Sequence, residues 1–285
     1  MLRSEKVFVV PEWRARLREQ GLDRIEALFT QTAGEVVASS GTSEVRRIIL
    51  EKGGRPHILF LKKYWFRTAR EIWKSALRGA FFGRPKVQKE FASLQRLQRL
   101  GINAATPLAW GVFRQARCLQ RSFLITEGVP HPTPLDAYIR DGLAVLSAPE
   151  NQRVRRRLIE RLADFTRQMH GQHFVHHDYF WRNIILSGTD PETFFLIDAP
   201  KGRRWFPGMA LRSRAKDLGT LDAPAPRFFR RTERLRFYLR YVNRARLTPA
   251  DKKLIRQAMA VAATERERQL RRVGIPPALA SRSAR

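Results

Sequence analysis

The sequence predicts an α+β protein with two lobes, a small antiparallel-sheet lobe followed by a larger and mostly helical lobe. Two observations predict this class. Up to about residue 128, the apolar runs are short and separated by turn residues, and only one long stretch has a helical period. After the proline-rich sequence VPHPTP, most apolar positions recur at steps of three and four. We therefore expect lobes over residues 1–128 and 129–285.

The small lobe is predicted to hold five strands and one long helix after a short helical lead-in over residues 12–31. The long helix runs from Pro85 to Leu100, because apolar residues share one face there and Gly101 ends the pattern. The strands are short apolar runs bounded by Gly, Ser and Thr turns, which is typical of an antiparallel sheet. They are expected at residues 36–38, 45–50, 57–62, 108–113 and 122–127.

The large lobe is predicted to be helical, with one strand pair inserted. In the first helix, apolar residues recur at steps of four and three, which indicates a buried face. Two short apolar strands then interrupt the helices. The expected helices cover residues 151–170, 232–243 and 250–272, and the strands cover residues 184–186 and 194–197.

Charge is the most unusual property of the composition. The formal net charge is +29 in 285 residues. Such a surplus attracts a polyanion: nucleic acid, anionic lipid head groups or a phosphorylated glycan. The surplus is spread along the whole chain, which disfavours a nucleic-acid-binding arm. A single cysteine, Cys118, excludes a disulfide framework and a multi-cysteine zinc site.

The sequence contains no apolar run long enough to span a bilayer. Its first residues, MLRSEKVFVVPEWR, are interrupted by charges and a proline before the apolar core of a signal peptide could form. We therefore expect a cytoplasmic protein. The sequence makes no prediction of an oligomeric state.

The strongest chemical signal is the sequence HHDYFWRN, residues 176–183, followed by an apolar strand and then by LID, residues 196–198. Phosphoryl transfer requires a carboxylate at the acceptor hydroxyl and oxygen ligands for a magnesium ion that bridges the phosphates. Asp178 fits the first role, and Asn183 and Asp198 fit the second. The spacing matches the kinase pattern H-x-D-x-x-x-x-N followed by a metal-binding Asp. The alternative is a pair of polar turns in an α/β hairpin.

A lysine and a glutamate upstream strengthen this interpretation. Lys62 ends an apolar strand, where kinases place the lysine that contacts the phosphates. Lys63 is the competing candidate. Side chains alternate between the two faces of a strand, so Lys62 shares the face of the apolar Phe60, which favours Lys62. Glu90 lies among the apolar residues of the next helix, where a carboxylate is costly unless it is paired. We expect Lys62 to be its partner, the alternative being that both are solvated charges.

Four histidines lie close together between residues 170 and 177. No cysteine is near them, and their spacing fits a helix end that runs into a loop rather than a zinc site. We expect His176 to support the loop structurally.

With these motifs, the sequence resembles the lipopolysaccharide-core kinases, which phosphorylate Kdo or heptose of the inner core. The resemblance extends from about residue 30 to about residue 243. It implies a protein-kinase-like fold, ATP with Mg²⁺, and a sugar hydroxyl on a lipid-linked or phosphorylated glycan as acceptor. Its clearest pieces are FLK (60–62), KEF (89–91), SFLITE (122–127), MH (169–170), the catalytic loop, LID (196–198) and KDL (216–218).

The resemblance also assigns roles to single residues. It implies that Lys62, Glu127, Asn183 and Asp198 bind the nucleotide and its metal. It makes Asp217 a carboxylate that braces the catalytic loop, which is compatible with an N-cap onto a helix that begins at Leu218.

Departures from related kinases narrow the class. Ala199-Pro200 follows Asp198 in place of Phe-Gly, and no Ala-Pro-Glu comes after it, which argues against a regulated protein kinase. The loop at residues 39–42, the candidate for backbone contacts to ATP, is poor in glycine. An aminoglycoside-type kinase is disfavoured because a strongly basic protein repels a cationic acceptor. An alternative of another class is a non-catalytic pseudokinase or a nucleic-acid-binding module. The intact Lys62, Asp178, Asn183 and Asp198 argue against a pseudokinase.

Residues 62–86 interleave aromatic and basic side chains, with Glu71 as the only acid. This pattern suits an anionic membrane surface, which would place the protein at the inner face of the cytoplasmic membrane. Two alternatives remain. The aromatic residues can pack on the small lobe, or Trp65 and Trp73 can stack on nucleic-acid bases.

Overall fold

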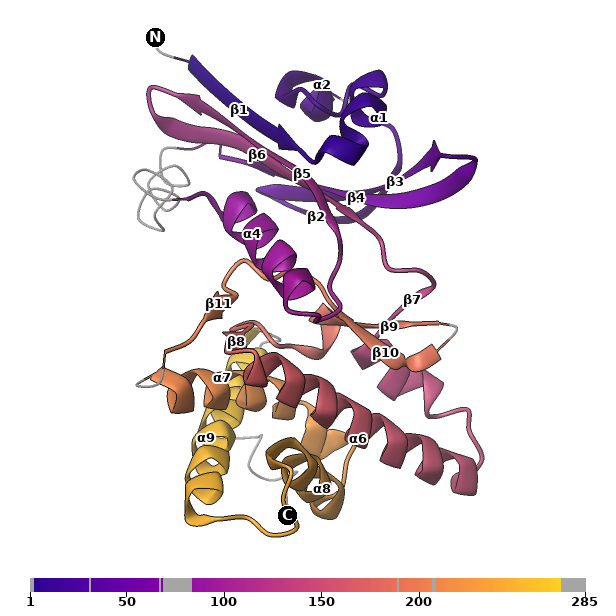
Figure 1. Cartoon of the computed structure of the whole chain (residues 1–285), viewed down its shortest axis with the longest axis vertical. Coiled ribbons are helices and arrows are strands. Elements are labelled where there is room, and N and C mark those ends of the chain that lie inside the picture. Colours follow the sequence, from indigo (N-terminus) through magenta and orange to yellow (C-terminus); the bar gives the residue numbers. More distant parts are fainter. Residues whose placement is uncertain are drawn as a thin grey trace. The chain divides into compact units, whose positions relative to one another are not determined.

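The computed structural model describes residues 3–30, 32–66, 68, 84–188, 190–206 and 209–272. The chain divides into two compact units, Met1–Pro130 and His131–Arg285, each of which is described by itself (Figure 1). The division lies two residues beyond the boundary that the sequence suggested.

Unit 1 is built on a six-stranded antiparallel sheet in the order β1-β5-β6-β4-β3-β2. The tight turn Gly53-Gly54 joins β3 to β4. Both glycines have positive φ, of 58° and 70°, which is the conformation that two-residue hairpin turns require. The strands are β1 (Arg3–Val9), β2 (Glu35–Ser40), β3 (Ser43–Lys52), β4 (Arg55–Trp65), β5 (Pro107–Gln115) and β6 (Cys118–Glu127).

Both faces of this sheet are covered. Helices α1 (Arg14–Glu19) and α2 (Ile25–Thr30) lie on one face and α4 (Lys86–Arg99) lies on the other (Figure 1). Leu59 and Leu61 of β4 are fully buried in the cluster beneath α1 and α2. The cluster beneath α4 includes Phe91, Trp110 and Leu124. Successive residues of a strand therefore enter two different cores.

Two features of unit 1 differ from the prediction. The first strand, β1, pairs with β5 and was not expected, because most of its residues are polar and exposed. The helical lead-in expected over 12–31 is present, but it is interrupted. The chain turns at Gly21, whose φ is 65°, and α1 and α2 are separate short helices after a 3₁₀ turn at Pro11–Trp13.

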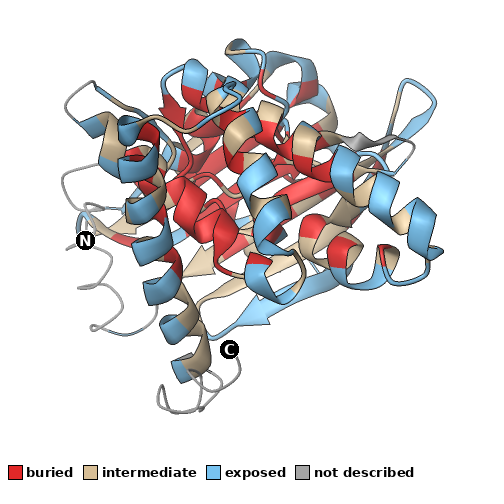
Figure 2. Ribbon diagram, turned by 90° about the horizontal axis from the view of Figure 1, so that it is seen from below, coloured by how far each residue is buried: buried red, intermediate tan, exposed pale blue. Residues whose placement is uncertain are grey.

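Unit 2 is mainly helical, and most of its helices are buried along one side and exposed along the other (Figure 2), whereas residues 217–222 of one helix are all buried. One of its cores joins α6, α7, α8 and α9 through residues such as Ala163, Leu218, Tyr238 and Ala258. Short α5 (Leu135–Ala137) continues into a π-helical turn, Tyr138–Gly142. The long helices are α6 (Ala148–Gly171), α7 (Ala210–Asp222), α8 (Arg231–Val242) and α9 (Pro249–Arg272).

Two small sheets complete unit 2. The larger has the order β10-β9-β7, and the other pairs β11 with β8. Strand β7 lies inside the predicted proline-rich connector, where prolines are tolerated because it is an edge strand. The strands are β7 (Pro132–Pro134), β8 (Phe174–Val175), β9 (Ile184–Ser187), β10 (Asp190–Leu196) and β11 (Arg203–Arg204).

In the described part of the chain, no helix combines the length and the apolar character needed to cross a bilayer. The predicted membrane-binding segment lies mostly outside the described residues, at positions 67 and 69–83. Its described aromatic residues pack within unit 1. Tyr64 contacts the cluster beneath α4, and the indole N–H of Trp65 donates to the carbonyl of Gly41 at 2.9 Å.

Candidate active site

Unit 1 brings Lys62 and Glu90 together. Lys62 Nζ lies 2.7 Å from Glu90 Oε1, and the Glu90 side chain on α4 is fully buried. A buried carboxylate is stable only when it is paired and hydrogen-bonded, so this contact explains why an acid is tolerated on the apolar face of α4. The pairing expected from the sequence is confirmed.

Lys63 points to the other face of the sheet and contacts Glu44 at 3.5 Å. The parity argument from Phe60 was an insufficient reason for choosing Lys62, because β4 is covered on both faces. Leu59 and Leu61, which share the face of Lys63, are the more deeply buried set. The glutamate on α4 distinguishes the two lysines, since it meets only Lys62 in the described contacts.

Glu127 is the last residue of β6 and lies opposite Leu59 of β4. Its carboxylate Oε1 is 2.5 Å from Nδ1 of His57, and its backbone N–H donates to the carbonyl of Thr106 at 2.8 Å. The side chain is thus held at the end of the sheet. A role in nucleotide binding stays a prediction.

The catalytic-loop sequence of unit 2 forms a compact turn around the backbone of Asp178. The carbonyl of Asp178 accepts hydrogen bonds from the backbone N–H of Phe180 and from Asn183 Nδ2, both at 2.8 Å. The indole of Trp181 donates to the carbonyl of Leu221 on α7 at 2.8 Å. Because the amide nitrogen of Asn183 holds the loop, its amide oxygen is the atom suited to a cation.

Asn183 directly precedes the β9–β10 hairpin in the sequence, and Asp198 closely follows it. Leu196 pairs with Ile184, and the backbone N–H of Ile197 donates to the carbonyl of Asn183 at 3.0 Å. The hairpin register therefore places the next residue, Asp198, beside the catalytic loop. Asp198 has a φ of 57°, a left-handed conformation that is uncommon outside glycine and is frequent at functional sites.

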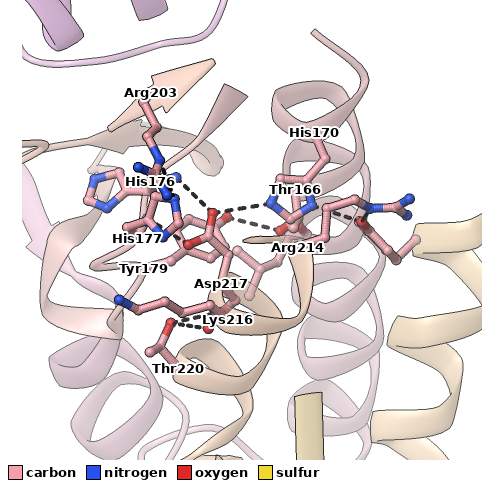
Figure 3. Close-up of polar contacts among 12 residues, drawn as sticks. Thr166, His170, His176, His177, Tyr179, Arg203, Arg214, Lys216, Asp217 and Thr220 are labelled. Carbon is pink, nitrogen blue, oxygen red and sulfur yellow. Dashed lines mark hydrogen bonds and ion pairs between the residues drawn. The ribbon is translucent and has the colours of Figure 1, made fainter. Parts of the chain in front are cut away.

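Asp217 organises the loop from below (Figure 3). Its fully buried carboxylate accepts the backbone N–H of His177 on Oδ1 and that of His176 on Oδ2, both at 2.7 Å, and Nε2 of His170 donates to Oδ2 at 3.2 Å. Asp217 lies inside α7, so the N-cap alternative is wrong. These contacts are those of a carboxylate that braces the loop, as the resemblance implies.

Electrostatics around Asp217 favour an ionised carboxylate beside a neutral histidine. Burial alone would raise the pKa of Asp217, but its hydrogen bonds from His170 and the loop hold that pKa below its usual range. Burial lowers the pKa of His170. Nδ1 of His170 then accepts from the hydroxyl of Tyr241 at 2.8 Å, and burial raises the pKa of Tyr241 to about 12.

The two histidines of the loop have structural partners. Nε2 of His176 donates to the carbonyl of Ile197 at 3.2 Å, which ties the loop to the residue before Asp198. The expectation that His176 supports the loop is confirmed. His177 has a φ of 62°, and its Nε2 accepts from Arg203 Nε at 3.2 Å. Burial lowers the pKa of both imidazoles, so the loop is held by neutral rings.

Lys201 is a site residue that sequence reasoning missed. Its ammonium lies 2.9 Å from Oδ1 of Asp178, although the side chain is mostly exposed. The signal in the sequence was a basic residue three positions after Asp198, but a single lysine in a strongly basic chain is not informative. Arg203 was missed for the same reason.

Comparison with known proteins identifies the family. A family model described as the lipopolysaccharide kinase (Kdo/WaaP) family matches residues 27–257. Two relatives are named lipopolysaccharide core heptose(I) kinase WaaP. The one from Escherichia coli is 29% identical over 179 residues, 61% of this chain and 63% of the relative. The one from E. coli strain K12 is 29% identical over 156 residues, 52% of this chain and 56% of the relative. The matches thus span less than two thirds of the length of these relatives.

A solved structure described as WaaP in complex with acyl carrier protein superposes with a TM-score of 0.62 at 23% identity, covering 92% of this chain and 98% of that one. This likeness confirms the predicted fold class, a protein-kinase-like fold with an antiparallel-sheet part and a helical part. Together with the match over residues 27–257, it leads to one conclusion: the chain belongs to the lipopolysaccharide kinase (Kdo/WaaP) family.

Proposed function

We propose that the protein is an ATP-dependent phosphotransferase that acts on a sugar hydroxyl of the lipopolysaccharide inner core. The observation that carries this proposal is the braced loop of unit 2. There, Asp217 and the β9–β10 hairpin fix the backbone that carries Asp178, Asn183 and Asp198. Phosphoryl transfer requires such a set: one carboxylate for the acceptor hydroxyl and two oxygen ligands for the metal ion. Unit 1 is the nucleotide-binding lobe in this proposal, and unit 2 is the catalytic lobe.

Each side chain has a role in this reaction. Asp178 accepts the proton of the acceptor hydroxyl. Lys62 binds the phosphates of ATP, and Glu90 holds the ammonium of Lys62 in place. Glu127, the last residue of β6, lies at the end of the sheet where the nucleotide binds. The contacts described above and the membership of the family support these assignments.

Asn183 and Asp198 suit a magnesium ion. An amide oxygen and a carboxylate are hard oxygen donors, and Mg²⁺ in such sites is held by only one or two protein groups together with substrate phosphates and water. When bound, the ion neutralises charge on the transferring phosphoryl group. Lys201 places an ammonium group 2.9 Å from Oδ1 of Asp178.

The acceptor is either heptose or Kdo. Both relatives carry the name heptose(I) kinase, which supports heptose. The net charge of +29 suits a phosphorylated, lipid-linked glycan, and we propose a cytoplasmic protein that docks peripherally on an anionic membrane.

A phosphate-transfer assay with labelled ATP tests the proposal. The acceptors are lipopolysaccharide core ending in heptose, Kdo-bearing lipid A precursor, an aminoglycoside and casein, side by side. We expect label in one inner-core acceptor only, and a loss of about 10²-fold or more with Asp178→Asn, because a positioned base is removed. Asp141→Asn, in an exposed pair with Arg140, is the matched control. Transfer to the aminoglycoside or casein, or full activity of Asp178→Asn, would refute the proposal.

A further inference from the structure

Unit 2 carries a run of basic and aromatic residues shortly after Asp198. Residues 201–216, KGRRWFPGMALRSRAK, include six basic side chains and no acid. The run begins beside the proposed catalytic carboxylate, because Lys201 Nζ lies 2.9 Å from Asp178 Oδ1. It includes β11 and the first turns of α7, which can be found in Figure 1. The contact of Lys201 with Asp178 does not account for the residues that follow.

The first residues of this run are fixed to the body of unit 2. Strand β11 pairs with β8 over two residues. The backbone N–H of Trp205 donates to the carbonyl of His173 at 2.9 Å, and the rings of these two residues lie 4.5 Å apart. These contacts determine where the next residue, Phe206, lies.

Two apolar side chains then face solvent. Phe206 is 67% exposed, which makes it the most exposed aromatic residue of the described chain, and Met209 is 47% exposed. The backbone N–H of Met209 donates to the carbonyl of Phe206 at 2.9 Å, so the two residues stay close together. An isolated exposed apolar residue is ordinary, but an exposed pair among cations is typical of a segment that lies in a membrane interface.

Two arginines flank this apolar pair. Arg204 precedes it on β11, Arg212 follows it in the first turn of α7, and both residues are exposed. Within the described residues, neither arginine forms a salt bridge with a carboxylate. Exposed cations beside an apolar contact strengthen binding to an anionic leaflet, because the lipid head groups attract them.

The apolar pair lies close to the proposed reaction centre. Phe206 is five residues beyond Lys201, and a chain spans at most about 3.6 Å per residue, so their Cα atoms are at most about 18 Å apart. A sugar on a lipid anchor is held near the head groups. A membrane contact this close to Asp178 therefore brings the carboxylate to the layer in which the acceptor hydroxyl lies.

We propose that Phe206 and Met209, with the two flanking arginines, form a membrane-contact site that docks the protein on a leaflet rich in anionic lipid. The apolar pair enters the boundary between head groups and acyl chains, and the arginines contact lipid phosphates. This inference rests on the proposed function, because it names the surface that brings the kinase to a lipid-linked acceptor. The site is separate from residues 62–86, the segment that the sequence pattern favoured.

An environment-sensitive dye attached at single positions tests where the contact lies. Cys118→Ser removes the only cysteine, and the dye NBD is then attached at Met209→Cys or, as the control, at Met259→Cys. Met259 lies on α9 and is 49% exposed, which matches Met209. With vesicles of phosphatidylglycerol and phosphatidylcholine, NBD emission should rise and shift to shorter wavelengths at position 209 only. Vesicles of phosphatidylcholine alone should change neither. No response at position 209, or an equal response at both positions, would overturn the proposal.

Two pairs of serine variants test the apolar contact without changing the charge. Phe206→Ser combined with Met209→Ser should weaken binding to the anionic vesicles about tenfold, because two interfacial apolar side chains are lost. Val145→Ser combined with Met259→Ser is the matched control, since these residues are 83% and 49% exposed elsewhere in unit 2. The control should bind like the wild type. Equal binding by both variants would contradict the site.

Two pairs of glutamine variants test the arginines at equal net charge. Arg204→Gln combined with Arg212→Gln should weaken vesicle binding about tenfold. Arg153→Gln combined with Arg231→Gln removes the same charge from exposed positions on α6 and α8, and it should weaken binding by no more than about twofold. Equal losses would indicate attraction by net charge alone and would overturn the site.

Transfer to a soluble acceptor separates this proposal from the kinase proposal. The variant with Phe206→Ser and Met209→Ser should phosphorylate a soluble core sugar like the wild type, and its KM for an acceptor embedded in anionic vesicles should rise. If the wild type phosphorylates the soluble sugar but position 209 does not respond to vesicles, the docking site is refuted and the kinase proposal stands. If position 209 responds and no transfer occurs, the kinase proposal is refuted and the membrane contact stands.

Discussion

Replacing Asp217 by Asn tests whether one buried carboxylate holds the catalytic loop. In the native structure this carboxylate accepts three hydrogen bonds, from the backbone of His176 and His177 and from His170. The asparagine amide is nearly the same size, so the core around α7 keeps its packing. It nevertheless replaces one acceptor oxygen by an NH₂ group and removes the negative charge.

The magnitude follows from these three contacts. Hydrogen bonds to a charged group contribute about 1.5–3 kcal/mol each, roughly twice the neutral value. In its least damaging orientation the amide nitrogen faces the N–H of His177, so one bond is lost and two buried donors oppose each other. The two remaining bonds weaken because the charge is gone. Together these changes predict a loss of about 3–5 kcal/mol of unfolding free energy.

The assay is thermal unfolding followed by circular dichroism. For a unit of this size 1 kcal/mol corresponds to about 2–4 °C, so Asp217→Asn should lower Tm by about 10 °C. Asp141→Asn is the control, because Asp141 forms a well exposed pair with Arg140 at 2.8 Å, and such exposed pairs contribute little to stability. A Tm for Asp217→Asn within 2 °C of the wild type would refute the idea that this carboxylate braces the loop.

Three further outcomes are expected. Asn183→Ala and Asp198→Ala should each raise the Mg²⁺ concentration needed for half-maximal activity, because each removes an oxygen ligand; an unchanged requirement in both would argue against a metal site there. Lys201→Met should lower kcat about tenfold with little change in the KM of the acceptor, because the cation beside Asp178 is lost. Lys201→Arg should retain most of the wild-type kcat, because it keeps a cation there. Equal activity of the wild type and both variants would remove Lys201 from the mechanism. Burial lowers the pKa of the three histidines around Asp217, so near and below about pH 6.5 the unfolded chain binds more protons than the folded chain. The wild-type Tm should therefore fall as the pH is lowered from 7.0 to 5.5. A constant Tm would contradict neutral imidazole rings in the folded protein.

Elements with regular patterns and clear turn residues were predictable from the sequence. The β3–β4 hairpin, α4 and the β9–β10 hairpin lie where glycines and apolar periods indicated. Helix α7 was expected only as a helix beginning at Leu218, in the N-cap alternative for Asp217, because most of its buried residues are small or polar. At Gly219 a Cβ would lie 2.5 Å from the carbonyl of Ala258 on α9, so close helix packing replaces the usual apolar stripe. Hydrophobic periodicity cannot detect such a face.

The site was predictable where chemistry requires a fixed spacing. Asp178 and Asn183 belong to one short motif, and Glu90 was recognisable as a carboxylate on an apolar helix face. Lys201 and Arg203 were not recognisable, because their contacts depend on how the chain turns after Asp198. That turn includes a left-handed residue that is not glycine, and composition alone does not reveal such a conformation.

The adjacent lysines of β4 affect how relatives of this chain should be aligned. Lys62 and Lys63 are chemically identical, yet one meets Glu90 and the other meets Glu44. A shift of a single position in this strand would exchange the lysine of one face for that of the other, and the two aligned lysines would still match. The acid on α4 therefore serves as an anchor for the correct register. A homologue that keeps both lysines but lacks the α4 glutamate would retain the charge pattern of this strand without the ion pair that positions Lys62.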